Sequence, residues 1–268
     1  MTLSFVLFLF LVHLGIGVIF SLVLVSKEAG VKFFRFNAGL AAVLLLIGLA
    51  FRPDEVDLAP GTQGGALLAV MVATGAILVY WATIGRVLAW LRPGLLGLAV
   101  VAGVGGLVLQ ALAIAGDASS LMATLTVVSF LTSTALLGST CTAMTLGHWY
   151  LVLPSMPVDH LQSVVKFHIG STAARILVVG AAVWWALTVA DLPEPGFYRY
   201  MMSIDGIFFW QRVLFGLLGP VVLAYMTWET AKIQATQSAT GILYVDFFTV
   251  MVGEVLAKYL LVATTVPV

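Results

Sequence analysis

The chain has few charged residues and a single cysteine. Only 9% of its 268 residues are Asp, Glu, Lys or Arg, whereas soluble globular domains carry about 25%. The 12 basic and 12 acidic residues cancel, which excludes nucleic-acid binding driven by charge as the main function. The lone cysteine, Cys141, excludes a disulfide framework, a thiolate zinc site and an iron–sulfur cluster held by this chain alone.

Signatures of soluble catalysis are also absent. The sequence contains no phosphate-loop pattern, no HExxH and no CxxCH haem-attachment motif. The longest polar break, 191–205, has about 15 residues, which is too short for a folded catalytic domain. Any chemistry is therefore expected at membrane depth or on a partner subunit.

Apolar residues make up 62% of the chain, and the mean hydropathy is +1.12. Eight apolar segments, each long enough to cross a hydrocarbon core of about 30 Å, are separated by short polar breaks. We predict an all-α, polytopic integral membrane protein with one transmembrane domain over 1–268. The first segment lacks a basic start and a cleavage site, so we predict a retained span and not a signal peptide. The predicted spans are about 2–25, 34–51, 64–91, 94–115, 121–152, 161–190, 206–231 and 239–266.

Charge alternates between successive loops. One set of loops and span ends is basic and carries Lys27, Lys32, Arg35, Arg86, Arg92, Lys166 and Lys232. The other set is acidic and carries Asp54, Glu55, Asp57, Asp117, Asp191, Glu194 and Asp205. Because basic loops stay on the cytoplasmic side, this alternation predicts that both termini lie outside. We expect the protein in a bacterial cytoplasmic membrane.

Ionisable residues inside the spans are concentrated in the second half of the chain. Each costs about 2.5–3.5 kcal/mol on insertion scales, so each is expected to have a partner or a purpose. The first half has only His13 and the polar Gln110. The second half has His148, His168, Arg175, Arg212, Asp246, Glu254 and Lys258. Any site is therefore expected in the last four spans.

Two of these spans carry charges at matching depths. His168 and Asp246 lie about 10 Å into their spans, and Arg175 and Glu254 lie about 21–22 Å in. The i, i+4 spacing of Asp246, Glu254 and Lys258 places them on one face. We therefore predict an Arg175–Glu254 ion pair, which either locks two helices or belongs to a proton path or a polar ligand pocket. In the second case Asp246 and Glu254 carry protons and Arg175 is their counter-charge, whereas Lys258 either joins the stripe or extends to the surface.

Histidines offer a candidate cofactor site. His148 and His168 are expected at depths that differ by only about 5 Å on antiparallel neighbouring spans. Such a pair is suited to bis-imidazole ligation of haem iron, to a quinone or proton site, or to a purely structural role. His13 either hydrogen-bonds another helix or is a further cofactor ligand. Arg212 either contacts a quinone head group or extends to the surface beside Asp205.

The eight-span architecture without large loops resembles the membrane-anchor subunits of the polysulfide and dimethyl-sulfoxide reductase group. The resemblance covers the whole chain as topology and carries no residue across. It implies a quinone site and soluble iron–sulfur partners. A histidine pair suited to haem departs from the haem-free members of that group, so a separate b-type cytochrome is the alternative.

Together these observations predict a membrane subunit of a redox complex that exchanges electrons between the quinone pool and partner proteins. Quinone is the expected cofactor, and b-type haem bound by His148 and His168 is a further hypothesis. The expected partners are other subunits of a membrane complex and the lipid bilayer, without nucleic acid. The alternatives are a proton-coupled transporter or channel and a cofactor-free assembly subunit.

Overall fold

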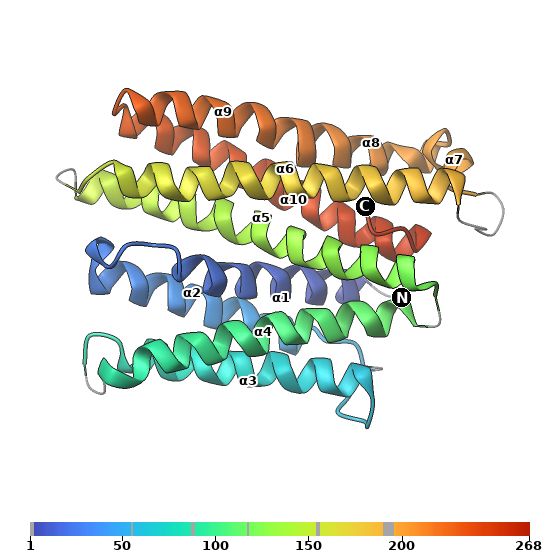
Figure 1. Ribbon diagram of the computed structural model, residues 1–268, viewed down its shortest axis with the longest axis horizontal. Coiled ribbons are helices and arrows are strands. Elements are labelled where there is room, and N and C mark those ends of the chain that lie inside the picture. The colour runs from blue at the N-terminus through green and yellow to red at the C-terminus, as the bar shows by residue number, and fades with distance from the viewer. Residues whose placement is uncertain (1–2, 55, 87–88, 117, 154–155, 190–195) are drawn as a thin grey trace.

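The computed structural model describes residues 3–54, 56–86, 89–116, 118–153, 156–189 and 196–268 (Figure 1). Its helices are α1 (Leu3–Leu22), α2 (Gly30–Ala50), α3 (Thr62–Thr83), α4 (Arg92–Ala115), α5 (Ser120–Val152), α6 (Asp159–Thr188), α7 (Gly196–Met201), α8 (Ile207–Val213), α9 (Gly219–Lys232) and α10 (Thr236–Thr264). Short 3₁₀ turns cover Lys27–Ala29, Ala89–Leu91 and Ile204–Gly206, and a π-helical turn covers Leu214–Leu218. The described part of the chain contains no strand.

Eight of these helical segments are long and apolar enough to cross a membrane, which confirms the predicted number. The segment Ile204–Lys232, which contains α8, the π-helical turn and α9, counts as one of them. Both ends of the chain lie toward the same end of the bundle (Figure 1). The orientation in the membrane stays a prediction. Of the predicted acidic loop residues, Glu55, Asp117, Asp191 and Glu194 lie outside the described residues, as do residues 2, 87, 88 and 190 of the predicted spans.

The predicted boundaries are correct to within a few residues except at one helix. The span predicted over 64–91 ends as α3 at Thr83. The hydroxyl of Thr83 donates to the carbonyls of Val79 and Tyr80, and Gly85 then adopts a positive φ of 74°. The apolar residues that follow belong to a separate 3₁₀ turn, Ala89–Leu91. Apolar composition extended the prediction past this glycine turn because apolar residues resume in the sequence directly after Arg86.

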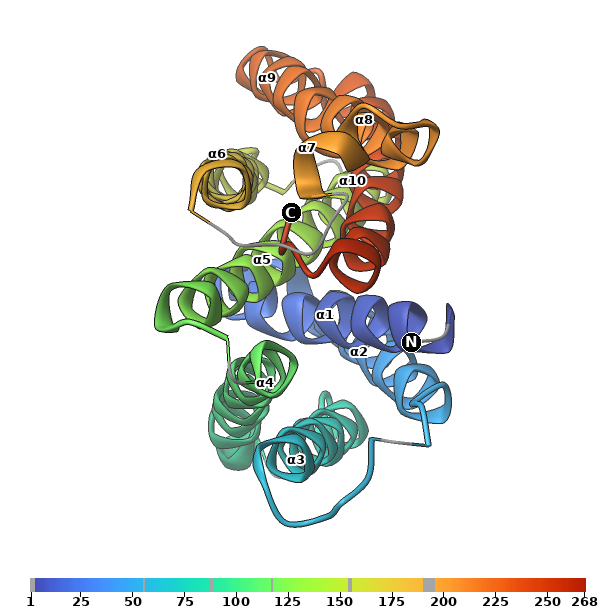
Figure 2. The same cartoon turned by 90° about the vertical axis from the view of Figure 1, so that its right-hand side faces the viewer.

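The helices form a long row in cross-section. Figure 2 shows α3 and α4 at one end of the row, α6 and α9 at the other, and α1, α5 and α10 between them. α1 packs against both α2 and α5, and α10 packs against both α5 and α9. α1 is the most buried of the eight candidate spans. It therefore links the first four helices to the rest.

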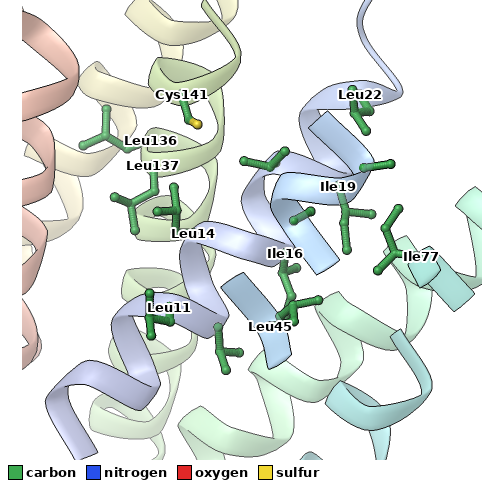
Figure 3. Close-up of a cluster of buried hydrophobic side chains, with 14 of the residues drawn as sticks. Leu11, Leu14, Ile16, Ile19, Leu22, Leu45, Ile77, Leu136, Leu137 and Cys141 are labelled. Carbon is green, nitrogen blue, oxygen red and sulfur yellow. The ribbon is translucent and has the colours of Figure 1, made fainter. Parts of the chain in front are cut away.

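Apolar side chains fill the space around α1. Leu14, Ile16 and Ile19 of α1 point toward Leu45 of α2 and toward α3 and α5 (Figure 3). In a membrane such contacts are stabilised by close packing and not by expulsion of water, since lipid tails are as apolar as leucine. Close packing is tightest where α1 crosses α5. A methyl group on Gly17 would lie 2.3 Å from the Thr134 carbonyl oxygen, so only glycine fits this crossing.

Candidate functional site

Glu254 of α10 lies at the centre of a buried group of charges. Its Oε1 accepts hydrogen bonds from Arg175 Nε at 2.9 Å and from Arg212 Nη2 at 2.8 Å. Its Oε2 accepts from Arg175 Nη2 at 3.3 Å, from Lys258 Nζ at 3.0 Å and from Ser133 Oγ at 2.5 Å. The four charged side chains are each at most 3% exposed. We call Glu254, Arg175, Arg212, Lys258 and Ser133 the ion cluster.

The Arg175–Glu254 ion pair predicted from the sequence is confirmed. For two other residues of this region, the alternative of extending to the surface is wrong. Arg212 is fully buried and binds Glu254, so it neither extends to the surface nor pairs with Asp205. Lys258 also turns inward, to Glu254 and to the Ser133 hydroxyl. The prediction assumed that a cation near a span end reaches water, whereas a buried carboxylate within hydrogen-bond distance competes with hydration.

A glycine crossing brings Arg212 to the cluster. A methyl group on Gly253 would lie 2.2 Å from the Gly216 Cα, so α10 and the π-helical turn touch backbone to backbone. Arg212 precedes this turn by two residues, and its Nη1 lies against both glycines. π-helical turns recur at functional sites because they re-aim side chains. Pro220 lies in the first turn of α9, two residues after the π-helical turn ends.

Positive charge exceeds negative charge in the ion cluster. Three cationic side chains, Arg175, Arg212 and Lys258, share one acidic side chain, Glu254, among the described residues. Arg175 Nη1 also donates to the Ser129 hydroxyl at 2.7 Å, and its Nη2 donates to the Val268 backbone oxygen at 3.1 Å. Among the described residues, Arg212 Nε and Nη1 have no hydrogen-bond acceptor. Buried charges are costly unless fully paired, so this arrangement is not explained by stability alone.

A second buried pair lies nearer the other end of the bundle. His168 Nε2 of α6 is 2.7 Å from Asp246 Oδ2 of α10, and both side chains are fully buried. The ring N–H is poorly aligned with the carboxylate, whose oxygens have no well-aligned hydrogen bond among the described residues. His168 Nδ1 lies 3.0 Å from the Thr140 hydroxyl of α5 and 3.3 Å from that of Ser139. Asp246 precedes Glu254 by eight residues, which is about 12 Å along α10.

The predicted pairing of His148 with His168 is wrong. His168 lies level with Thr140, whereas His148 lies eight residues further along α5, about 12 Å away along the axis. His148 is exposed, and its Nδ1 is 3.0 Å from the Tyr244 hydroxyl. The depth estimate failed because it counted both residues from predicted span ends that are not level.

These contacts do not fit a haem held by the two histidines. Both ring nitrogens of His168 already have protein partners, Asp246 on one side and Thr140 with Ser139 on the other. An axial ligand needs one nitrogen free to face the iron. Within the described residues, no group of three or more His, Cys, Asp or Glu side chains is placed to hold a metal ion.

His13 connects the ion cluster to the first half of the bundle. Its Nδ1 is 3.4 Å from Ser133 Oγ, and its ring packs edge-on to Phe130 at 4.5 Å between centroids. This contact agrees with the prediction that His13 hydrogen-bonds another helix. The carboxamide of Gln110 in α4 also lies near this ring. Neither His13 Nε2 nor Gln110 Oε1 has a well-aligned hydrogen bond among the described residues, although both atoms are buried.

Gln110 also lines a cavity of about 420 Å³ between α1, α3 and α4. The rest of the lining is mostly apolar and includes Phe5, Phe8, Leu67 and Ile114. Pro53 and Val56, in the loop between α2 and α3, line its mouth at the predicted outer end. A volume of this size, with an apolar wall and few polar groups, is typical of small-molecule sites.

The sequence prediction missed the hydroxyl groups of α5. Four buried hydroxyl groups of α5 contact the two charged groups. Ser129 and Ser133 contact the ion cluster, and Ser139 and Thr140 contact His168. Their spacing places the first two one turn apart on the same face, and Thr140 follows Ser133 by seven residues on that face. Serine and threonine are common in membrane helices, where most donate to their own backbone, so composition alone does not distinguish these four.

No protein-family model matches the sequence, and no curated protein matches it either.

Proposed function

We propose that this chain is the membrane subunit of a redox complex in which the protons of a quinone pass through the buried polar side chains of α1, α5, α6 and α10. One observation carries the proposal. A line of buried polar groups runs from the cavity, through Gln110 and His13, to Ser133 and the ion cluster. The likeness in topology to quinol-interacting membrane anchors agrees with this proposal.

The cavity supplies the environment that a quinone needs. Phe5, Phe8 and Leu67 suit the ring and tail of a lipophilic molecule, and Gln110 supplies a polar group at the inner wall. Gln110 Oε1 accepts from a quinol hydroxyl, and its amide group donates to a quinone oxygen. Because Gln110 Oε1 is buried without a well-aligned partner, a ligand that satisfies it removes a penalty of about 1–3 kcal/mol.

His13 is placed to relay a proton. An imidazole accepts a proton at one nitrogen and releases another at the second. Here Gln110 lies near the ring, and Nδ1 contacts the Ser133 hydroxyl, which in turn contacts Lys258 and Glu254. Oxidation of a quinol releases two protons and two electrons. In this proposal the protons enter at His13, and the electrons go to a redox protein bound as a partner subunit.

The two carboxylates serve different roles in this proposal. Both oxygens of Glu254 already accept hydrogen bonds from the cations and Ser133, so Glu254 holds the cluster together. Asp246 has only His168 as a charged partner among the described residues. The His168–Asp246 pair is therefore the better candidate for proton transfer toward the predicted inner end. Haem has no part in this proposal.

The direct test is quinone binding by the purified protein. Addition of a short-chain benzoquinone to the protein in detergent is expected to quench tryptophan fluorescence with a saturable dependence. Gln110→Leu is expected to weaken binding at least tenfold, because it removes the carboxamide that the proposal places against the quinone oxygen. Thr126→Val is the matched control, because Thr126 is a buried polar residue that donates only to the Met122 carbonyl. Equal binding by wild type and Gln110→Leu would contradict the proposed site.

A second measurement separates redox coupling from a channel. Vesicles that contain the protein and an internal pH dye are given a membrane potential without quinone. The proposal predicts no proton influx above that of empty vesicles. Influx that His168→Ala abolishes would instead support the proton-coupled channel.

A further inference from the structure

A second cavity lies between the first four helices, at the end of the bundle opposite the quinone cavity. It has a volume of about 530 Å³ and lies where α1 ends, α2 begins, α3 ends and α4 begins. This is the predicted inner end of the bundle. The apolar part of its wall includes Leu22, Val25, Phe34, Ile84 and Leu96.

The polar part of this wall contains donors without acceptors to match. Lys27 and Arg92 both line the cavity, and no acidic side chain of the described residues lines it. Arg92 Nη2 donates to the Thr83 carbonyl at 3.2 Å, but its Nε is buried with no hydrogen-bond partner among the described residues. Tyr80 of α3 lines the same wall. Glu28, the acidic residue next to Lys27, pairs with another residue, because its Oε2 lies 2.7 Å from His160 Nε2.

We propose that this cavity binds an anionic phospholipid, with its phosphate at Arg92, Lys27 and Tyr80 and an acyl chain along the apolar wall. The wall thus combines cationic donors at the interface with apolar surface that extends into the bundle. This combination matches a lipid that carries both negative charge and an acyl chain, whereas a zwitterionic head group would bring an unmatched cation next to Lys27 and Arg92. A guanidinium with a free Nε binds phosphate oxygens in a fixed geometry.

The location supports a lipid over a soluble ligand. Positively charged clefts between membrane helices on the cytoplasmic side are sites where anionic head groups bind. The neighbouring segments at this end add further basic residues, Lys32, Arg35 and Arg86, so the local field attracts negative charge. The proposal does not depend on the proposed quinone function, since the two cavities share no lining residue.

The test is a lipid-binding measurement on the full chain. The purified protein, washed free of native lipid, is titrated with phosphatidylglycerol or phosphatidylcholine, and bound lipid is counted by native mass spectrometry. We expect one phosphatidylglycerol to bind at least tenfold more tightly than phosphatidylcholine. Arg92→Gln is expected to abolish this preference, and Lys27→Gln is expected to reduce it by about threefold to tenfold.

Arg86→Gln is the matched control. Arg86 is an exposed arginine at the same end of the bundle and does not line the cavity, so its loss is expected to leave the preference unchanged. An equal loss of the phosphatidylglycerol preference with Arg86→Gln would show that the basic end of the bundle attracts anionic lipid without a defined site, and it would overturn the proposal. Because Lys27 is exposed, we expect Lys27→Gln to fold even if Arg92→Gln does not. An unchanged preference for phosphatidylglycerol in Lys27→Gln would also overturn the proposal.

Inorganic phosphate separates the two sources of a phosphate group. The proposal predicts that millimolar phosphate does not displace phosphatidylglycerol, because free phosphate lacks the acyl chain that fills the apolar wall. Complete displacement by phosphate would overturn the lipid as occupant and identify a free phosphate site. Equal binding of both lipids to the wild type would likewise overturn the proposal, since it would show recognition of acyl chains alone.

Discussion

The two halves of the bundle bury their helices in different ways. α1 to α4 pack through apolar side chains around α1, and their buried polar groups are few. α5 to α10 bury three cations, two carboxylates and a histidine between helices that also touch through glycine. Apolar contacts are individually small and tolerate local change, whereas a buried charge network depends on every member. In the first half we therefore expect the loss of stability to scale with the apolar contacts that a substitution removes. In the second half we expect the loss of one charged group to destabilise the whole network.

The largest effect is expected from Glu254→Gln. The change keeps the shape of the side chain and removes the charge that three cations share, so the free energy of unfolding is expected to fall by about 3–5 kcal/mol. Chemical denaturation in detergent, followed by tryptophan fluorescence, measures this loss. Glu229→Gln is the control, because Glu229 forms an ion pair with Lys232 at the surface, and a change of about 0–1 kcal/mol is expected there. Equal small changes in both variants would refute the contrast between the halves.

Leu45→Ala tests the apolar half. Leu45 is fully buried between α2 and α1, and its truncation is expected to cost about 2–5 kcal/mol, depending on how far the cavity collapses. The neighbouring Leu46 is 47% exposed, and Leu46→Ala is expected to cost far less. The same denaturation experiment compares the two variants. A cost for Leu46→Ala equal to that for Leu45→Ala would show that the packing around α1 does not carry the stability of this half.

Asp246→Asn is expected to have an intermediate effect on stability. It removes the charged partner of a fully buried histidine, so a loss of about 1–3 kcal/mol is expected. In the reconstituted redox complex with quinol, we expect the variant to slow proton release during turnover. The amount of assembled complex is expected to fall by a smaller factor. Normal proton release together with lost assembly would assign the pair a purely structural role.

The smallest effect is expected from His148→Ala. His148 is exposed and contacts Tyr244, so its loss is expected to change stability by no more than about 0.5 kcal/mol. His168→Ala, in contrast, leaves Asp246 buried without its partner and is expected to be clearly destabilising. A large effect of His148→Ala on stability or quinone binding would restore the histidine near the helix end as a functional group.

Much of the fold could be predicted from the sequence because membrane spans are encoded locally. An apolar stretch of sufficient length is enough to predict each span, and the eight spans were found in this way. The Arg175–Glu254 pair was also predictable, since charges at matching depths on two spans have few other partners. The end of α3 was missed because apolar residues resume in the sequence directly after the glycine turn that follows Thr83.

The candidate site was predictable only in part, because its members come from different helices. A position near the surface was one alternative for both Arg212 and Lys258. Instead, the Gly216–Gly253 crossing brings Arg212 to Glu254, and the i, i+4 spacing places Lys258 beside the same carboxylate. The prediction that His148 and His168 lie at similar depths was wrong for a related reason. Helix register decides which residues are level, and the sequence does not state the register between neighbouring spans.

The sequence by itself determined the number of helices, their apolar character and the concentration of charges in the second half, because these properties depend on length and composition. Only the tertiary structure decided which charges meet, that His13 of the first half contacts the ion cluster, and where the two cavities lie. Contacts between helices depend on crossing points set by glycines far apart in the chain, such as Gly17 on α1 beside Gly138 on α5. The length and apolar character of one helix depend on its own residues, whereas a contact among several helices forms only when those helices pack together.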